Sequence, residues 1–355
     1  MPHSRYKMYS FVCDYLEGCL PQILEALRES NLEQTPGYGN DSYCSEARDI
    51  IRKECGLPDA EVFFLVGGTQ TNSTVISHIL RPHQGVLCAS TGHINVHETG
   101  AIEHGGHKVI QMPSKDGRIC AEQLEAELQA HFSDPDRYHS VQPGMVYISL
   151  PTELGTLYSK AELSSISDVC GKWRIPLFID GARLGYGLSS PACDLSLKDV
   201  ASLADIFYIG GTKQGALFGE AVVFRSGEGP ARDFKYFVKQ NGALLAKGRL
   251  LGIQFKTLFA DGLYLRAASA AVEKALRIKK AFSDRGTGFL VDSYTNQQFP
   301  ILSKRETSLL KERFDFEFWK KIDEQHDAVR FCTSWATTDD AVESLIRAIN
   351  DIERS

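Results

Sequence analysis

Short, unbroken apolar runs recur through the middle of the chain, and longer segments of mixed polarity separate them. Because these runs do not alternate between apolar and polar residues, they are typical of strands buried on both faces of a sheet. The intervening segments, such as AEQLEAELQAHF at 121–132 and KAELSSISDVCGKW at 160–173, read as helices. Strands that alternate with helices predict an α/β fold with a mostly parallel sheet covered on both sides. The runs are VFFLV at 62–66, VLCA at 86–89, KVIQM at 108–112, MVYIS at 145–149, PLFID at 176–180, IFYIG at 206–210 and AVVF at 221–224.

The carboxyl-terminal part of the chain has a different pattern. Residues 256–283, rich in Ala, Leu, Lys and Arg, read as helix, and HDAVRFCTSW at 326–335 reads as a strand. TTDDAVESLIRAINDIE at 337–353 reads as a closing helix with Thr and Asp at its start. We therefore expect a domain change near residue 255. The expected parts are an amino-terminal arm and helix at 1–30 that packs with the small domain, a large domain at 31–255, and a small α+β domain at 256–355.

Composition and charge narrow the class of protein. The 355 residues exceed one typical domain, and 43% hydrophobic with 24% charged residues is an ordinary globular balance. The net charge of -6 and the scattered lysines and arginines argue against a nucleic-acid surface. The most apolar run is too short to cross a bilayer, and MPHSRYKMYSFV lacks the apolar core of a signal peptide, so we expect a cytoplasmic protein with no membrane partner. Nine cysteines without C-x-x-C spacing predict reduced, mostly buried thiols.

Four of the ten histidines fall in TGHINVHETGAIEHGGH at 91–107, which raises the question of a zinc site. On a continuous helix, His93, His97 and His104 would share one face. Gly100 weakens that helix and the glycine pair at 105–106 ends it, so the shared face is lost for at least one ligand. No carboxylate or cysteine completes a zinc shell, and Glu98 is either an acid that supports a ligand or a solvated helix charge. We therefore predict no metal, and a histidine-rich helix in which His93 alone is functional.

The ends of the apolar runs carry the candidate chemistry, because ligands of an open α/β sheet bind beyond the carboxyl ends of its strands. In FLVGGTQTN a run ends at Val66, two glycines turn the chain, and Thr69 and Gln70 open a predicted helix. The N–H groups of that helix would face an anion such as phosphate. A tight turn with Thr69 as the helix cap is the alternative. The segment matches neither G-x-x-x-x-G-K-[ST] nor G-x-G-x-x-G, which disfavours a P-loop or a dinucleotide site.

An acid and a lysine follow two successive runs. Asp180 ends the run at 176–180, and Arg183 comes three residues later. A buried acid needs a partner, so Arg183 either pairs with Asp180 or grips a ligand carboxylate while Asp180 holds a proton on a ligand nitrogen. Lys213 follows the next run among glycines, where burial would let it attack a carbonyl; a lysine that extends to solvent is the alternative. Lysine, acid and a helix amino terminus for phosphate are what pyridoxal phosphate requires.

Six segments carry a family resemblance: DYLEG at 14–18, GYGNDSY at 37–43, VGGTQTN at 66–72, GHINVHETGA at 92–101, IDGARLGYGL at 179–188 and GGTKQGALFGE at 210–220. In this order they resemble the threonine aldolase and β-eliminating lyase group of pyridoxal-phosphate enzymes, from about Asp14 to the carboxyl terminus. The group has the aspartate-aminotransferase fold, also called fold type I. The resemblance therefore implies a three-layer large domain with a mostly parallel seven-stranded sheet, and a smaller α+β domain.

The resemblance implies a role for each matching residue. Lys213 would bind the cofactor covalently, Asp180 would bond its pyridine nitrogen, and the His93 ring would stack on its pyridine face. Substrate-binding groups would include two arginines for the carboxylate, one of them from the small domain. The implied cofactor contacts are Gly68, Thr69, Gln70, His93, Asp180, Arg183, Thr212, Lys213 and Lys247, and the implied substrate contacts are Cys13, Asp14, Glu153, Arg183 and Arg330.

Three positions depart from the family pattern. Cys13 stands where members often have Ser or Asn near the substrate carboxylate, and Glu153 stands about where many threonine aldolases carry a histidine near the β-hydroxyl group. Lys247 or Arg249 takes the place of a family arginine near the neighbouring subunit's phosphate. Members are dimers or tetramers with active sites between subunits. We therefore expect a homo-oligomer, a homotetramer among the options, with Tyr38 and Lys247 reaching into the neighbour's site.

The leading hypothesis is a pyridoxal-phosphate aldolase that cleaves a small β-hydroxy-α-amino acid, of the L-threonine or L-allo-threonine type, to glycine and an aldehyde. Lys213 or His93 would pass protons during this reaction. A nearer alternative keeps the cofactor and makes the enzyme a β-eliminating lyase or a racemase for another small amino acid. The more distant alternatives are a metal hydrolase built on the histidines, a catalytically silent relative, and Cys-His catalysis by Cys13.

Overall fold

The structure is a computed structural model, and it describes residues 8–352. Within that range the largest sheet has seven strands in the order β2-β8-β7-β6-β5-β3-β4. β8 runs antiparallel to both of its neighbours, and the other neighbouring pairs are parallel. The mostly parallel sheet is confirmed, and each of the seven predicted runs is a strand. These are β2 (Glu61–Leu65), β3 (Gln84–Ala89), β4 (Lys108–Met112), β5 (Gln142–Ser149), β6 (Leu177–Asp180), β7 (Ile206–Gly210) and β8 (Glu220–Phe224).

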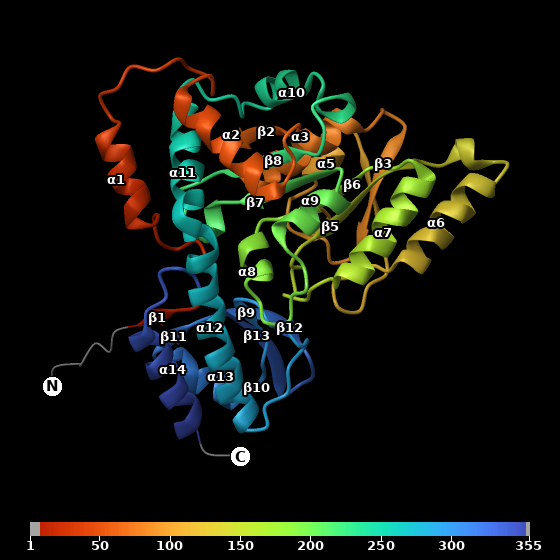
Figure 1. Ribbon diagram of the computed structural model, residues 1–355. Coiled ribbons are helices and arrows are strands. Elements are labelled where there is room, and N and C mark those ends of the chain that lie inside the picture. Colours follow the sequence, from red (N-terminus) through yellow and green to blue (C-terminus); the bar gives the residue numbers. More distant parts are fainter. Residues whose placement is uncertain (1–7, 353–355) are drawn as a thin grey trace.

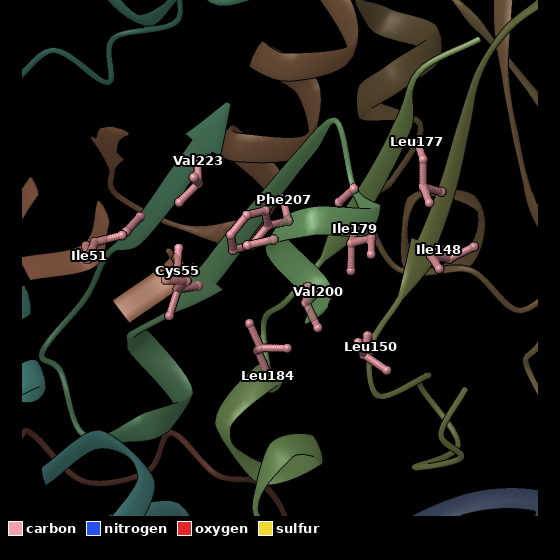
Figure 2. Close-up of a cluster of buried hydrophobic side chains, with 14 of the residues drawn as sticks. Ile51, Cys55, Ile148, Leu150, Leu177, Ile179, Leu184, Val200, Phe207 and Val223 are labelled. Atoms are coloured by element: carbon pink, nitrogen blue, oxygen red, sulfur yellow. The ribbon is translucent and has the colours of Figure 1, made fainter. Parts of the chain in front are cut away.

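Helices bury both faces of this sheet, so the large domain has three layers (Figure 1). One face carries α2 (Ser42–Cys55), α6 (Ala121–Ser133), α7 (Lys160–Trp173), α9 (Leu197–Leu203) and α11 (Arg249–Phe259). The other carries α3 (Gly68–Ile79), α4 (His93–Val96), α5 (Ala101–His104) and α10 (Phe234–Gln240). Neighbouring strand residues point to opposite faces, so Val146 of β5 joins the first core and Met145 the second. Figure 2 shows the first core, where side chains of α2 and α9 meet those of β6, β7 and β8.

The smaller domain has its own core. Its sheet has the order β10-β13-β12, with β9 also paired to β13. The predicted strand at 326–335 and the closing helix are both present, and Thr338 caps that helix by accepting a hydrogen bond from Ala341 N. The elements are β9 (Gln297–Gln298), β10 (Ile301–Ser303), α13 (Lys304–Lys311), β11 (Phe314–Asp315), β12 (Glu317–Lys321), β13 (His326–Cys332) and α14 (Asp339–Asp351).

The amino-terminal arm contacts both domains. Its strand β1 (Tyr9–Ser10) pairs with β11, and Phe11 lies in the small-domain core. α1 (Pro21–Glu29) packs on α11 of the large domain. The arm predicted at 1–30 begins, over residues 1–7, outside the described part of the chain, as does the end of the small domain at 353–355.

A long helix joins the domains. α12 (Leu263–Asp284) packs with its first half on α8 (Leu184–Leu188), and with its last turns in the small-domain core (Figure 1). The helix predicted over 256–283 is not continuous, because Asp261 adopts a left-handed backbone with φ 51° between α11 and α12. No helix within residues 8–352 has the length and apolarity needed to cross a membrane. Short 3-10 helices are η1 (Arg137–His139), η2 (Thr212–Gln214), η3 (Gly229–Ala231) and η4 (Ala260–Gly262).

Candidate active site

The ends of several strands meet at one edge of the large sheet. β6 and β7 are parallel neighbours, and the antiparallel β8 begins where β7 ends. Asp180 is the last residue of β6, Lys213 lies in η2 just after β7, and Glu220 is the first residue of β8. Because β6 and β7 point the same way, Asp180 and Lys213 lie at the same edge of the sheet.

Lys213 is only partly exposed, which disfavours the alternative of a lysine that extends freely to solvent. Burial lowers its pKa, and the nearby positive charge of Arg183 lowers it further. A side chain of α8 fixes the η2 turn, because Tyr186 Oη donates a 2.6 Å hydrogen bond to the carbonyl oxygen of Lys213. A lysine with a lowered pKa is neutral more often and can attack a carbonyl carbon.

Glu220 anchors the turn that carries Lys213, and sequence reasoning gave it no role. Its Oε2 accepts a 3.1 Å hydrogen bond from Gly211 N, and its Oε1 accepts a 3.0 Å bond from Thr212 Oγ1. Burial raises the pKa of Glu220 to about 8, although the positive charge of Lys213 opposes that shift. The one feature of the sequence that could have indicated this role is the position of Glu220 directly before the apolar run at 221–224. The Thr212 hydroxyl hydrogen is thus committed to Glu220.

Asp180 is buried and accepts three hydrogen bonds. Tyr147 Oη and Asn72 Nδ2 donate to Oδ2 over 2.6 and 3.1 Å, and Ala182 N donates to Oδ1 over 3.0 Å. Burial alone would raise the pKa of Asp180, but the charge of His93 and the tyrosine hydroxyl lower it below its usual value. A carboxylate kept ionised in a buried site is suited to hold a proton on a ligand nitrogen.

Arg183 does not pair with Asp180, which removes one of the two predicted interpretations. Its Nε and Nη2 donate to Asp14 Oδ2 and Oδ1 over 2.6 and 2.9 Å. Asn296 Nδ2 also donates to Asp14 Oδ2, over 2.9 Å, so the arm, the large domain and the small domain meet here. Burial would raise the pKa of Asp14, yet the Arg183 charge holds it below its ordinary value. Cys13, the preceding residue, is also buried.

Arg330 reaches this region from β13 of the small domain. Its Nη1 donates to Gln297 Oε1 and its Nη2 to Val12 O, both over 3.0 Å, and Nη2 also forms an ion pair with Glu317. Its guanidinium carbon lies 5.2 Å from the centre of the Trp319 ring. Among residues 8–352, Nε of this buried arginine has no hydrogen-bond partner. An unpaired N–H on a buried arginine is uncommon and is a reason to expect a ligand carboxylate nearby.

His93 is the first residue of α4 and is held at two points. Its Nδ1 lies 2.7 Å from Glu98 Oε1, and its backbone N–H donates to Glu153 Oε1 over 2.9 Å. Ser149 Oγ, at the end of β5, donates to the same Glu153 oxygen. Burial raises the pKa of Glu153. Glu98 is buried, so the interpretation of a solvated helix charge is wrong.

The predicted histidine-rich helix is wrong. Two short helices replace it, because Thr99 and Gly100 adopt left-handed backbones with φ 53° and 72°. The His97 ring lies 5.5 Å from that of His93 and 6.3 Å from that of Trp319. That His93 alone is functional stays a prediction. Burial lowers the pKa of His97. Within the described chain, no group of three or more His, Cys, Asp or Glu side chains is arranged to hold a metal ion.

The amino terminus of α3 lies at the end of β2, as the VGGTQTN segment predicts. Gly67 is the N-cap and no side chain caps the helix, so Thr69 is not the cap. A Cβ atom at Gly67 would meet nothing within 4 Å, and at Gly68 it would lie 3.2 Å from Tyr208 Oη. The Gln70 side chain accepts a hydrogen bond from Val66 N and donates one to Asn241 O. The first N–H groups of α3 are therefore available to an anion.

Tyr38 and Lys247 lie together, away from these groups. Tyr38 N donates to Ala246 O over 3.2 Å, which brings the two loops side by side, and both side chains are exposed. Arg249, the other candidate, is committed to the carbonyl oxygens of Asn31 and Glu33. Their expected role in a neighbouring subunit's site stays a prediction.

The arrangement fits pyridoxal phosphate on the chain's own features. The uncapped α3 terminus with open space at Gly67 suits a phosphate, and the ionised Asp180 suits a protonated ring nitrogen. Lys213 supplies the amine, and the unpartnered Nε of Arg330 suits a carboxylate.

Comparisons with known proteins agree with this arrangement. The family model described as beta-eliminating lyase matches residues 14–297. A low-specificity L-threonine aldolase of a Pseudomonas species is 30% identical over 345 residues, covering 96% of this chain and 97% of that protein. The corresponding enzyme of Pseudomonas aeruginosa is 29% identical over 342 residues, covering 96% of each chain.

Solved structures extend the likeness to the fold. A threonine aldolase of Leishmania major is 41% identical with a TM-score of 0.93, covering 96% of this chain and 98% of that one. Aspartate aminotransferase of Thermus thermophilus is 14% identical with a TM-score of 0.68, covering 97% and 91%, and so shows only the shared fold. The fold is therefore that of fold type I enzymes, and the chain belongs to the threonine aldolase and β-eliminating lyase family of pyridoxal-phosphate-dependent enzymes.

Proposed function

We propose that the protein is a pyridoxal-phosphate-dependent aldolase that cleaves a β-hydroxy-α-amino acid, of the L-threonine or L-allo-threonine type, to glycine and an aldehyde. One observation carries this proposal. Lys213, whose pKa is lowered by burial, and the ionised Asp180 lie at the ends of two adjacent parallel strands. The threonine aldolases of Pseudomonas and Leishmania to which the chain is similar support the same reaction class.

The cofactor-binding roles follow from position. Lys213 would be the attachment point, Asp180 would hold a proton on the ring nitrogen, and His93 would lie beside the ring. The N–H groups at Gly68, Thr69 and Gln70 would bind the phosphate. When bound, pyridoxal phosphate supplies an electron-withdrawing ring that stabilises negative charge on the substrate's α-carbon.

The chain's own residues orient the substrate and move its protons. Arg330 has an unpartnered Nε for the substrate carboxylate, whereas Arg183 has two of its donor nitrogens bound to Asp14. Arg330 is therefore the principal carboxylate ligand, with Arg183 and Cys13 beside it. Glu153 accepts a hydrogen bond from the backbone N–H of His93, and we expect both side chains to act on the proton of the β-hydroxyl group.

An assay with three substrates tests the reaction. The holoenzyme should release glycine and acetaldehyde from L-threonine or L-allo-threonine, and Lys213→Ala should abolish this. Lys280→Ala, which removes an exposed lysine on α12, is the matched control and should retain full activity. If L-serine gave pyruvate and neither threonine isomer gave an aldehyde, the protein would be a β-eliminating lyase and the aldolase proposal would be wrong.

We also propose a homo-oligomer, a dimer or tetramer, with the active site between subunits. Tyr38 and Tyr236 are 45% and 72% exposed and line one apolar hollow with Leu244, a composition typical of a protein contact. Mixing Lys213→Ala with a double variant of Tyr38 and Lys247 should restore part of the activity if each site draws on two chains. A cytoplasmic location stays a prediction from the sequence.

A further inference from the structure

A chain of buried side chains links His93 to Asp180. Glu98 Oε1 lies 2.7 Å from His93 Nδ1 and 2.7 Å from Asn72 Nδ2. The same Asn72 nitrogen donates to Asp180 Oδ2 over 3.1 Å. Asn72 lies on α3, one turn after the amino terminus of that helix. The hydrogen bonds therefore connect the start of α3 with the His93 ring and with Asp180 of β6.

Glu98 is not placed to anchor a loop. The two donors to its carboxylate, among residues 8–352, are side chains of the site, and neither is a backbone N–H group. Its side chain is fully buried, and within the same range its Oε2 and the Asn72 Oδ1 have no hydrogen-bond partner. A buried carboxylate with one bare oxygen costs stability, which points to a function in the site.

The contact decides which nitrogen of His93 carries hydrogen. A carboxylate oxygen only accepts hydrogen bonds, so Nδ1 has to be the donor. In the neutral ring, Nε2 then has the free lone pair. The His93 side chain is 30% exposed, so one side of the ring faces open space at the site.

We propose that Glu98 is a positioning residue that fixes His93 as the Nδ1–H tautomer and leaves Nε2 as the proton acceptor at the reacting bond. Asn72 donates one N–H to each carboxyl group and so links Glu98 to Asp180. The role of Nε2 rests on the proposed aldolase function. There, Nε2 takes the β-hydroxyl proton, the O–H electron pair becomes the C=O bond of the aldehyde, and the bonding pair between the α- and β-carbons stays on the α-carbon. The same proton then moves to that carbon to complete glycine.

The tautomer is measured directly by long-range ¹H–¹⁵N spectra of holoenzyme labelled with ¹⁵N-histidine, with His93→Gln to assign the signals. The wild type should show hydrogen on Nδ1 of His93. Glu98→Gln keeps an acceptor oxygen and should keep that tautomer, whereas Glu98→Leu removes it and should move the hydrogen to Nε2. Hydrogen on Nε2 in the wild type overturns the proposal even if neither Glu98 variant folds.

Kinetics give the second readout. Glu98→Leu should lower kcat by at least about tenfold, the usual effect of removing the group that orients a histidine, with KM changed by less than about threefold. Glu103→Gln, an exposed glutamate on α5, is the matched control and should change neither value. An unchanged tautomer and kcat in folded Glu98→Leu contradict the proposal. If the wild type has the Nδ1–H tautomer but no aldolase activity, the proposed function fails and the tautomer assignment stands.

Discussion

Asp14 and Arg183 form a buried, two-pronged ion pair between the amino-terminal arm and the turn after β6. Two guanidinium nitrogens contact the two carboxylate oxygens, and the side chains are 0% and 12% exposed. Because Asn296 of the small domain donates to the same carboxylate, this pair joins three parts of the chain at the edge of the active site.

Asp14→Asn should therefore destabilise the protein. The change keeps the shape of the side chain but leaves Arg183 as an uncompensated buried charge, at a cost of about 3 kcal/mol. Urea denaturation measures the effect. Asp292→Asn breaks an ion pair with Lys279 in which the acid is 71% exposed, and it should cost less than about 1 kcal/mol. If both variants lost the same free energy of unfolding, burial would not determine how much the ion pair of Asp14 contributes to stability.

Glu220→Gln should stabilise the protein at high pH. Burial raises the pKa of Glu220 from its ordinary 4.5 to about 8, so over this range the folded protein holds a proton that the unfolded chain has lost. Wild-type stability therefore falls as pH rises from about 4.5 to about 8. Glutamine mimics the protonated acid and avoids this loss. The urea midpoint of the variant should exceed that of the wild type at pH 9 and match it at pH 5; a gap independent of pH speaks against the assignment.

Two glycine-to-alanine variants should have opposite effects. At Gly155, φ is 72° and a Cβ atom would lie 2.4 Å from Ser293 Oγ, so Gly155→Ala should cost about 1–3 kcal/mol. At Gly171, inside α7, a Cβ atom would meet nothing within 4 Å, so Gly171→Ala should add about 0.5–1 kcal/mol. Thermal unfolding of both variants checks the sign of each effect, and stabilisation by Gly155→Ala is the result that would not fit.

Asn72→Asp should weaken cofactor binding. It replaces the donor between Glu98 and Asp180 with a third carboxylate, and like charges in a buried site repel. We expect the Kd for pyridoxal phosphate to rise by at least about tenfold, since like-charge contacts cost several kcal/mol. Fluorescence titration of the apoprotein measures this Kd. Asn31→Asp adds the same charge at an exposed position and should leave the Kd unchanged.

The sequence predicted what short segments determine. Each of the seven strands contains one of the predicted runs, and the placement of Asp180, Lys213 and the start of α3 follows from where those runs end. The helix predicted at 160–173 is present because Ser159 and Glu162 form a reciprocal capping box.

Contacts between distant segments could not be predicted in this way. Asp14 and Arg183 are 169 residues apart, and Asn72 and Asp180 are 108 apart, so no local pattern relates them. The prediction of one histidine-rich helix is wrong for a local reason. Thr99 and Gly100 adopt left-handed backbones, which end one short helix before the next begins.

The covalent attachment of pyridoxal phosphate to Lys213 tests the central claim most directly. The purified holoenzyme should absorb visible light, and reduction with borohydride should fix the cofactor on the peptide that contains Lys213, as shown by its mass. Lys213→Ala should lose both the visible absorbance and the labelled peptide. A label on another lysine, or a Lys213→Ala protein that keeps the absorbance of the wild type, would contradict the account.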